Sequence, residues 1–277
     1  KARMLADGFW GMEGMAWSPD GGSVLFSATI NGSEYVVRQV DMEGRVLPTR
    51  QNVGMVVIHD IAPDGAWAVT RDDYPIRLMF RAAGSPAETD LSWLDGSIYP
   101  TLSPDGKTIL FTDQGLAAGP NYGVTLRPTD GGSIVRLGEG MGMQFSTDGK
   151  RVLAIVPSTT PRIVSYPVGA GDAAQLDRGN FEKLNRAFWL PDGRVLVSGN
   201  EPGKPPRCFL LDPVSGANEP VGPEGIWEGI PSPDGTVFAA RSQAGWSIHP
   251  ISGTAEGRPV PSLDQTHYLI RWSPDGK

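Results

Sequence analysis

Few residues of this 277-residue sequence have the types and spacing that catalysis requires. Ser247 and His249 would share one face of a strand in GWSIHP, but the strained turn that holds a nucleophilic serine is missing. His59 and Asp60 adjoin, so on a strand their side chains would point to opposite faces. Cys208 lies in the alternating segment RCFLLD, which predicts a small buried hydrophobe. We therefore expect no enzymatic activity from this chain.

Patterns that bind phosphate, metals or nucleic acids are also lacking. The segment GEGMG at residues 138–142 has the glycines of a phosphate loop, but no helix signal follows it and no Walker lysine is present. One cysteine and three histidines argue against a Cys-rich or His-rich metal site. A net charge of -7 disfavours nucleic-acid binding, and no apolar run approaches the length of about 18 residues expected of a membrane span. We expect no cofactor, no metal, no nucleic-acid partner and no direct insertion of this domain into a membrane.

Large aromatic and charged side chains are the best candidates for binding a partner. They stand six to ten residues before an Asp-Gly pair, in the segments that lead into short apolar strands. Aromatic anchors often carry much of the energy of binding, and nearby charges can orient a ligand. Each residue could instead cap the rim of the core. The candidates are Trp10, Glu13, Tyr99, Arg186, Trp227, Glu228, His267 and Tyr268.

A turn motif that recurs seven times predicts the elements that position these residues. It reads SPDG, APDG, STDG or LPDG, and β-prone runs too short for helices, such as TILFT and RVLAI, follow it. Pro, Asp and Gly in this order are typical of a tight hairpin turn. The spacing of 41 to 44 residues between motifs fits one four-stranded propeller blade. The Asp residues of the motif are Asp20, Asp64, Asp105, Asp148, Asp192, Asp234 and Asp275. Because they are spaced one per blade, they do not converge as calcium ligands must.

The motif count predicts an all-β propeller of four-stranded antiparallel blades, with seven blades as the simplest count and six as the alternative. A content of 36 Gly and 25 Pro argues against a helix bundle. Only 2 residues follow Asp275, so the last blade is short of two strands. We expect the segment RMLA at residues 3–6 to complete this blade as its outer strand. We interpret residues 1–277 as a single propeller domain and as a fragment of a longer protein.

A large apolar residue stands three positions before the Asp in six of the seven repeats. Because it recurs with the period of the fold, we expect it to pack between neighbouring blades rather than to bind a ligand. The six residues are Trp17, Ile61, Leu102, Phe145, Trp189 and Trp272.

The segments that enter the inner strands of a propeller gather on one face around its channel. Loop-borne side chains on a rigid scaffold are where binding most often occurs. The other face consists largely of the near-identical PDG turns, which leave little room for specificity. We therefore expect the candidate residues to bind a partner or ligand at the entry face.

The complete set of turn and strand motifs resembles the TolB-like and WD-repeat-like β-propellers of bacteria. Segments such as VVIHDIAPDGAWAV, FWLPDGRVLVSGNEPGKPPRCFLLD and YLIRWSPDGK are similar to the C-terminal propellers of acidobacterial-type Ser/Thr protein kinases and related regulators. This resemblance implies a non-catalytic sensor or protein-interaction module of a bacterial signalling protein, in an extracytoplasmic compartment. The kinase motifs VAIK, HRD and DFG are absent from this chain.

Two other functions stay open. The chain could be the gating propeller of a prolyl-oligopeptidase-like hydrolase, or a lactonase-like metal enzyme. The first would require a hydrolase domain elsewhere in the same protein. The second would require acidic and Asn ligands converging in the channel, and acidic residues on the predicted inner strands are too few.

Overall fold

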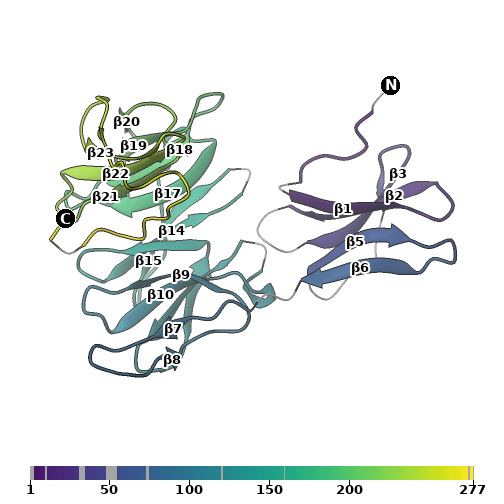
Figure 1. The fold of residues 1–277 in the computed structure, drawn as a ribbon, viewed down its shortest axis with the longest axis horizontal. Coiled ribbons are helices and arrows are strands. Elements are labelled where there is room, and N and C mark those ends of the chain that lie inside the picture. The colour runs from purple at the N-terminus through teal and green to yellow at the C-terminus, as the bar shows by residue number, and fades with distance from the viewer. Residues whose placement is uncertain are drawn as a thin grey trace. The chain divides into compact units, whose positions relative to one another are not determined.

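The described part of the computed structural model is built almost wholly from short strands and turns (Figure 1). It comprises residues 3–9, 11–30, 35–47, 55–72, 75–119, 121–158, 160–273 and 275–276. One 3-10 helix, Leu116–Ala118, is the only helix in these ranges. The all-β prediction is confirmed. The chain divides into two compact units, residues 1–98 with 112–123 and residues 99–111 with 124–277.

The first unit contains one four-stranded sheet and two hairpins. The sheet has the order β1-β2-β3-β4, and its strands are β1 (Gly11–Trp17), β2 (Ser23–Thr29), β3 (Val36–Asp41) and β4 (Val46–Leu47). The hairpins are β5 (Met55–Ile61) with β6 (Trp67–Asp72), and β7 (Met79–Phe80) with β8 (Thr89–Asp90). Buried Ala16, Leu25 and Val37 of the sheet pack against Ile58 of β5.

Four more four-stranded sheets follow, in which each strand pairs with its neighbours in sequence, as predicted for propeller blades. Their strands are β9 (Ser97–Leu102), β10 (Thr108–Asp113), β11 (Gly123–Pro128) and β12 (Val135–Glu139); β13 (Met141–Phe145), β14 (Arg151–Val156), β15 (Arg162–Pro167) and β16 (Ala174–Leu176); β17 (Lys183–Trp189), β18 (Val195–Asn200), β19 (Arg207–Leu211) and β20 (Asn218–Val221); and β21 (Glu228–Pro231), β22 (Val237–Ser242), β23 (Gly245–Pro250) and β24 (Arg258–Pro259).

The SPDG motifs form the predicted turns between the first two strands of a sheet. In the turn between β9 and β10, the Ser103 hydroxyl donates to Asp105 Oδ1 at 2.6 Å, and the same oxygen accepts the backbone N–H of Lys107 at 3.1 Å. Gly106 has a φ of +70°, a conformation that glycine adopts without strain. The same serine–aspartate bond recurs in the turns that begin at Ser18, Ser146 and Ser232.

Replacing Gly106 by Val is expected to lower the free energy of unfolding by about 1 to 3 kcal/mol, because a β-branched residue adopts a positive φ only with strain. A Cβ at this position would meet no atom within 4 Å, so the cost is conformational rather than steric. Thermal denaturation checks the value. Lys107→Val, at the next exposed position, is the matched control, and equal melting temperatures for the two variants would contradict the turn assignment.

Acid is expected to destabilise the protein through these turns. The serine hydroxyl and then a backbone N–H hold the pKa of Asp20, Asp105, Asp148 and Asp234 below the ordinary value of 3.8. A carboxyl with a lower pKa in the folded state than in the unfolded state stabilises the fold above its unfolded pKa, and loses that contribution as the pH falls through the folded pKa. Melting temperatures should therefore fall on acidification below about pH 4. Ser103→Ala, which removes one of these bonds, should make the fall shallower, and an unchanged pH dependence would contradict this origin.

Apolar side chains from adjacent sheets form the core between them. Leu153 and Ile155 of β14 pack with Val197 and Phe209 of the next sheet, and all four are buried. The apolar position three residues before the Asp contributes as predicted at Trp189, which packs against this cluster, and at Trp272, whose indole N–H donates to the Ile230 carbonyl at 2.9 Å. The prediction of packing between sheets is confirmed at these two residues. It is wrong at Trp17 and Leu102, whose side chains are 57% and 39% exposed.

Two parts of the described chain depart from the predicted regularity. The hairpins β5–β6 and β7–β8 lie in separate sheets, so the repeat around Asp64 does not form one four-stranded blade. The described residues after β24 form no strand, although the motif at Asp275 predicts a short apolar strand just before it. Neither departure is signalled by a local motif, because both depend on pairing between distant segments.

The predicted outer strand at residues 3–6 is also absent. Residues 3–9 have no strand; Leu5, Ala6 and Phe9 instead pack on the first sheet beside Phe26. The rings of Phe9 and Phe26 meet edge to face, with centroids 5.2 Å apart. Burial of these apolar side chains explains why the segment lies against this sheet. The number of blades and the single-domain interpretation stay predictions.

Candidate functional site

Five side chains form a continuous chain of polar and aromatic contacts in the second unit. They are Tyr99 of β9, Arg186 of β17, Glu228 of β21, Arg241 of β22 and Tyr268 of the C-terminal segment. We call this set the Arg-Glu-Arg site. Four of its members are residues that the sequence predicts for binding.

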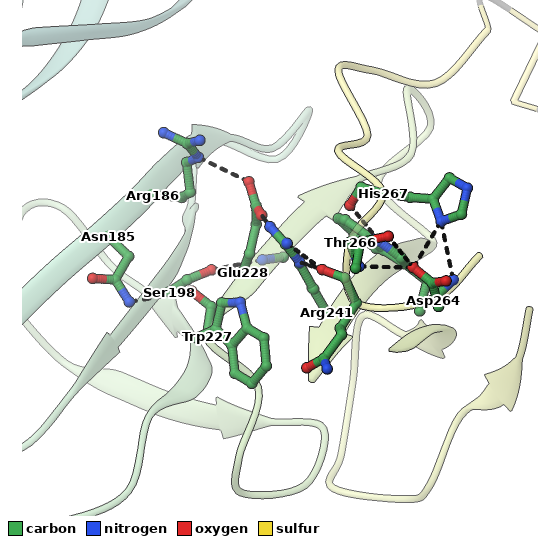
Figure 2. A network of polar contacts seen from close by, with 12 residues as sticks. Asn185, Arg186, Ser198, Trp227, Glu228, Arg241, Asp264, Thr266 and His267 are labelled. Atoms are coloured by element: carbon green, nitrogen blue, oxygen red, sulfur yellow. Dashed lines mark hydrogen bonds and ion pairs between the residues drawn. The ribbon is translucent and has the colours of Figure 1, made fainter. Parts of the chain in front are cut away.

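Glu228 lies at the centre of the site, between two guanidinium groups (Figure 2). Its Oε1 accepts from Arg186 Nε at 3.1 Å, and its Oε2 lies 3.4 Å from Arg241 Nη1. Glu228 and Arg241 are directly opposite each other on the antiparallel strands β21 and β22, so the sheet register itself pairs them. Only 10% of the Glu228 side chain and 11% of the Arg241 side chain are exposed, which makes this a largely buried ion pair.

An aromatic ring covers each arginine. The Arg186 guanidinium carbon is 5.2 Å from the ring centre of Tyr99, and that of Arg241 is 4.4 Å from the ring centre of Tyr268. Both distances are typical of cation–π contacts. Tyr99 is 53% exposed and Tyr268 is 77% exposed, so both rings also present a face to solvent. Tyr99 has a φ of +51°, which is costly for a residue other than glycine and is often found at functional positions.

The segment at residues 264–268 is tied to the sheet by several hydrogen bonds. Arg241 donates from Nε to the Gln265 carbonyl at 3.0 Å, and its Nη2 donates to the same oxygen. The indole N–H of buried Trp246 donates to the His267 carbonyl at 3.1 Å. Within the segment, hydrogen bonds from Thr266, and then from His267, lower the pKa of Asp264 to about 2. These bonds hold Tyr268 in place although the segment has no strand of its own.

The predicted residues lie at strand positions more often than the sequence indicated. Tyr99, Arg186 and Glu228 are within inner strands rather than in entry loops, because these strands begin earlier than their apolar cores. Trp227 directly precedes β21 and is half-buried, and its carbonyl accepts from the amide of Asn185 at 3.2 Å. The prediction of loop positions is therefore wrong for Tyr99, Arg186 and Glu228, whereas Trp227 and Tyr268 lie outside strands as predicted.

Besides Trp227, three predicted residues are not members of the Arg-Glu-Arg site. His267 is exposed, and its Nδ1 lies 3.0 Å from Asp264 Oδ1, while only its backbone carbonyl contacts the sheet. Glu13 belongs to the first unit. There, burial is the largest cause that raises the pKa of Tyr35, and the charge and hydrogen bond of Glu13 raise it further. Trp10 lies outside the described residues.

Arg241 is the member of the site that the sequence reasoning missed. The candidates all come from the segments before the inner strands, whereas Arg241 is on the second strand of its sheet. The hairpin register could have identified Arg241. Positions symmetrical about the Ser232–Gly235 turn face each other, so that Pro231 faces Phe238 and Glu228 faces Arg241.

The Ser247–His249 pair has the contacts of a buried structural histidine. Ser247 Oγ is 2.8 Å from His249 Nε2, and the other ring nitrogen is 3.3 Å from the Ala255 carbonyl. The imidazole stacks on Phe238 with ring centres 5.3 Å apart, and burial lowers the pKa of His249. The side chains share one face of β23 as predicted, but a carbonyl rather than a carboxylate faces Nδ1.

Two clefts of about 740 and 260 Å³ lie elsewhere in the second unit. The larger is lined by residues that include Arg162, Asp177 and Arg178, and the smaller by residues that include Lys204 and Arg207. The Arg-Glu-Arg site lines neither of them.

Within the ranges that the structure describes, no cluster of three or more His, Cys, Asp or Glu could hold a metal ion. The same ranges include no helix long and apolar enough to cross a membrane.

Comparison with solved structures identifies the fold class. The chain is similar to TolB from Acinetobacter baumannii, with 16% identity and a TM-score of 0.51 over 92% of this chain and 56% of that one. It is also similar to a TolB from Agrobacterium tumefaciens, with 16% identity and a TM-score of 0.51 over 96% of this chain and 87% of that one. The fold is therefore a TolB-like β-propeller, as the turn motifs predicted.

The match to puromycin hydrolase is more distant, and the two sequence comparisons find nothing. Puromycin hydrolase covers 86% of this chain with 13% identity and a TM-score of 0.47, and the match spans 44% of the hydrolase. No family model matches the sequence. A search of curated proteins finds no match either. The chain spans 56% of the A. baumannii TolB structure, and at these identities the likeness extends to the fold alone.

Proposed function

We propose that this propeller is a non-catalytic binding module whose partner, a protein or a small ligand, contacts the Arg-Glu-Arg site. The observation that carries the proposal is a pair of exposed tyrosines, Tyr99 and Tyr268, each stacked on an arginine that a shared buried glutamate holds in place. Tyrosine and arginine are enriched among the residues that dominate binding energy. A preordered arrangement also reduces the entropy lost when a partner binds.

The form of the site favours an extended partner such as a peptide or a protein segment. The site presents exposed aromatic faces, and it lines neither of the two clefts described above. Exposed aromatic rings with a polar surround are characteristic of protein interaction surfaces. The motif resemblance extends this proposal to a sensor or interaction role in a bacterial signalling protein outside the cytoplasm.

A binding screen against synthetic peptides and muropeptide fragments tests the proposal. Replacing Tyr99 or Tyr268 by Ala should weaken binding of the selected partner by about 2 kcal/mol, or about 30-fold, for at least one of the two. Asp105→Asn and Asp234→Asn, at the turn ends of the inner strands, are the controls and should leave binding unchanged. Binding that depends on the turn variants and not on either tyrosine would contradict the proposal.

A further inference from the structure

Arg186 has an unused hydrogen-bonding edge. Its Nε donates to Glu228, but in the described part of the chain its two terminal Nη atoms contact no acceptor. In Figure 2 the dashed line to Glu228 starts at Nε, and no dashed line starts at the terminal nitrogens of Arg186. Arg241 differs, because its Nη1 faces Glu228 and its Nε and Nη2 both donate to the Gln265 carbonyl. All three side-chain nitrogens of Arg241 thus donate within the protein, whereas the terminal nitrogens of Arg186 are available to a ligand.

The orientation of this open edge is fixed from two sides. The buried carboxylate of Glu228 holds Nε, and the ring of Tyr99 lies against the guanidinium. About a quarter of the Arg186 side chain, 26%, is exposed. A guanidinium held in this way loses little further freedom on binding and presents two parallel N–H donors.

The net charge of the site favours a ligand group with a single negative charge. Two arginines and one glutamate leave the site with one net positive charge, in a chain whose net charge is -7. Two parallel guanidinium donors match the two oxygens of a carboxylate. A phosphate dianion would leave an uncompensated negative charge beside Glu228, so a single carboxylate fits better.

We propose that the terminal Nη atoms of Arg186 bind a carboxylate of the partner, with an apolar group next to that carboxylate lying on the Tyr99 ring. A chain-terminal carboxylate and an acidic side chain both provide this chemistry. The proposal rests on the function proposed above, and it assigns Arg186 the role of the specificity-determining residue of the site.

Titration of the protein with 3-phenylpropionate and with its neutral amide, 3-phenylpropanamide, tests the carboxylate directly. We expect saturable shifts of the Arg186 Nε–H resonance with the acid, and binding of the amide about tenfold weaker, because the amide cannot form the charge-assisted pair. Arg186→Lys keeps the charge but removes the paired donors, and should weaken binding of the acid about fivefold or more. Arg162→Lys, at an exposed arginine of the larger cleft, is the matched control and should have no effect.

Several outcomes would overturn this inference. They are equal binding of acid and amide, absence of binding by the acid, indifference to Arg186→Lys, or displacement of the acid by an equal concentration of inorganic phosphate. The proposed function fails separately. A peptide found in the screen could lose affinity with Tyr99→Ala but not with Arg186→Lys. That result would support the proposed binding site and contradict the assignment of a carboxylate to Arg186.

Discussion

Replacing Glu228 by Gln is expected to lower the free energy of unfolding by about 3 kcal/mol, the lower end of the range for breaking a buried ion pair. The substitution keeps the shape of the side chain but leaves Arg186 and Arg241 as neighbouring cations without their shared anion. The lower end applies because Arg186 keeps 26% of its side chain exposed to water. Chemical denaturation at neutral pH measures the change.

Glu43→Gln is the matched control for this experiment. Glu43 pairs with Arg45 at 3.5 Å, but its side chain is 68% exposed, and exposed pairs contribute about 0 to 1 kcal/mol. High salt should reduce the small effect of Glu43→Gln and leave most of the effect of Glu228→Gln. If the two variants lose the same small amount of stability, the Glu228 carboxylate is not the centre of a buried network.

Replacing Trp246 by Ala is expected to cost about 3 to 5 kcal/mol, the range for removing a large buried aromatic side chain. Trp246 is 2% exposed and packs with Ile230 and Ala239. It also donates to the His267 carbonyl, so its loss should release the segment that carries Tyr268. The variant should therefore show a lower melting temperature and faster amide exchange at residues 263–268.

Trp246→Phe separates the two contributions. Phenylalanine keeps most of the buried apolar area but cannot donate to His267, so it should be less destabilising than Ala while still increasing exchange in the segment. Trp17→Ala is the control, because that side chain is 57% exposed and should cost about 1 kcal/mol or less. Unchanged exchange near His267 in both Trp246 variants would show that other contacts hold the segment.

The parts of the fold that local chemistry determines were predictable from the sequence. Each SPDG turn contains its own hydrogen bonds and its own positive φ, as at Ser103, Asp105 and Gly106, and therefore identifies a hairpin wherever it occurs. The separation of the β5–β6 hairpin from β7–β8, and the course of residues 3–9, depend on contacts between distant segments. No local pattern reports such contacts, and these are the points where the predictions failed.

The candidate site shows the same division. Tyr99, Arg186 and Glu228 share one position in the repeat, six residues before the Asp, so the period alone selected them. Their mutual contacts could not be predicted, because they depend on how one sheet packs beside the next. Arg241 was accessible in principle, since turn symmetry places it opposite Glu228, but only once the hairpin register is assumed.

The burial of Cys208 makes the protein well suited to fluorescent labelling. It is the only cysteine of the sequence, it has no exposed surface, and burial raises its pKa to about 12. A thiol of this kind stays protonated and reacts slowly with maleimides at neutral pH. A Lys183→Cys substitution, at an exposed position of the strand that carries Arg186, would therefore accept a dye selectively without removal of the native cysteine. Partner binding could then be followed as a change in emission of a dye on the same strand as Arg186.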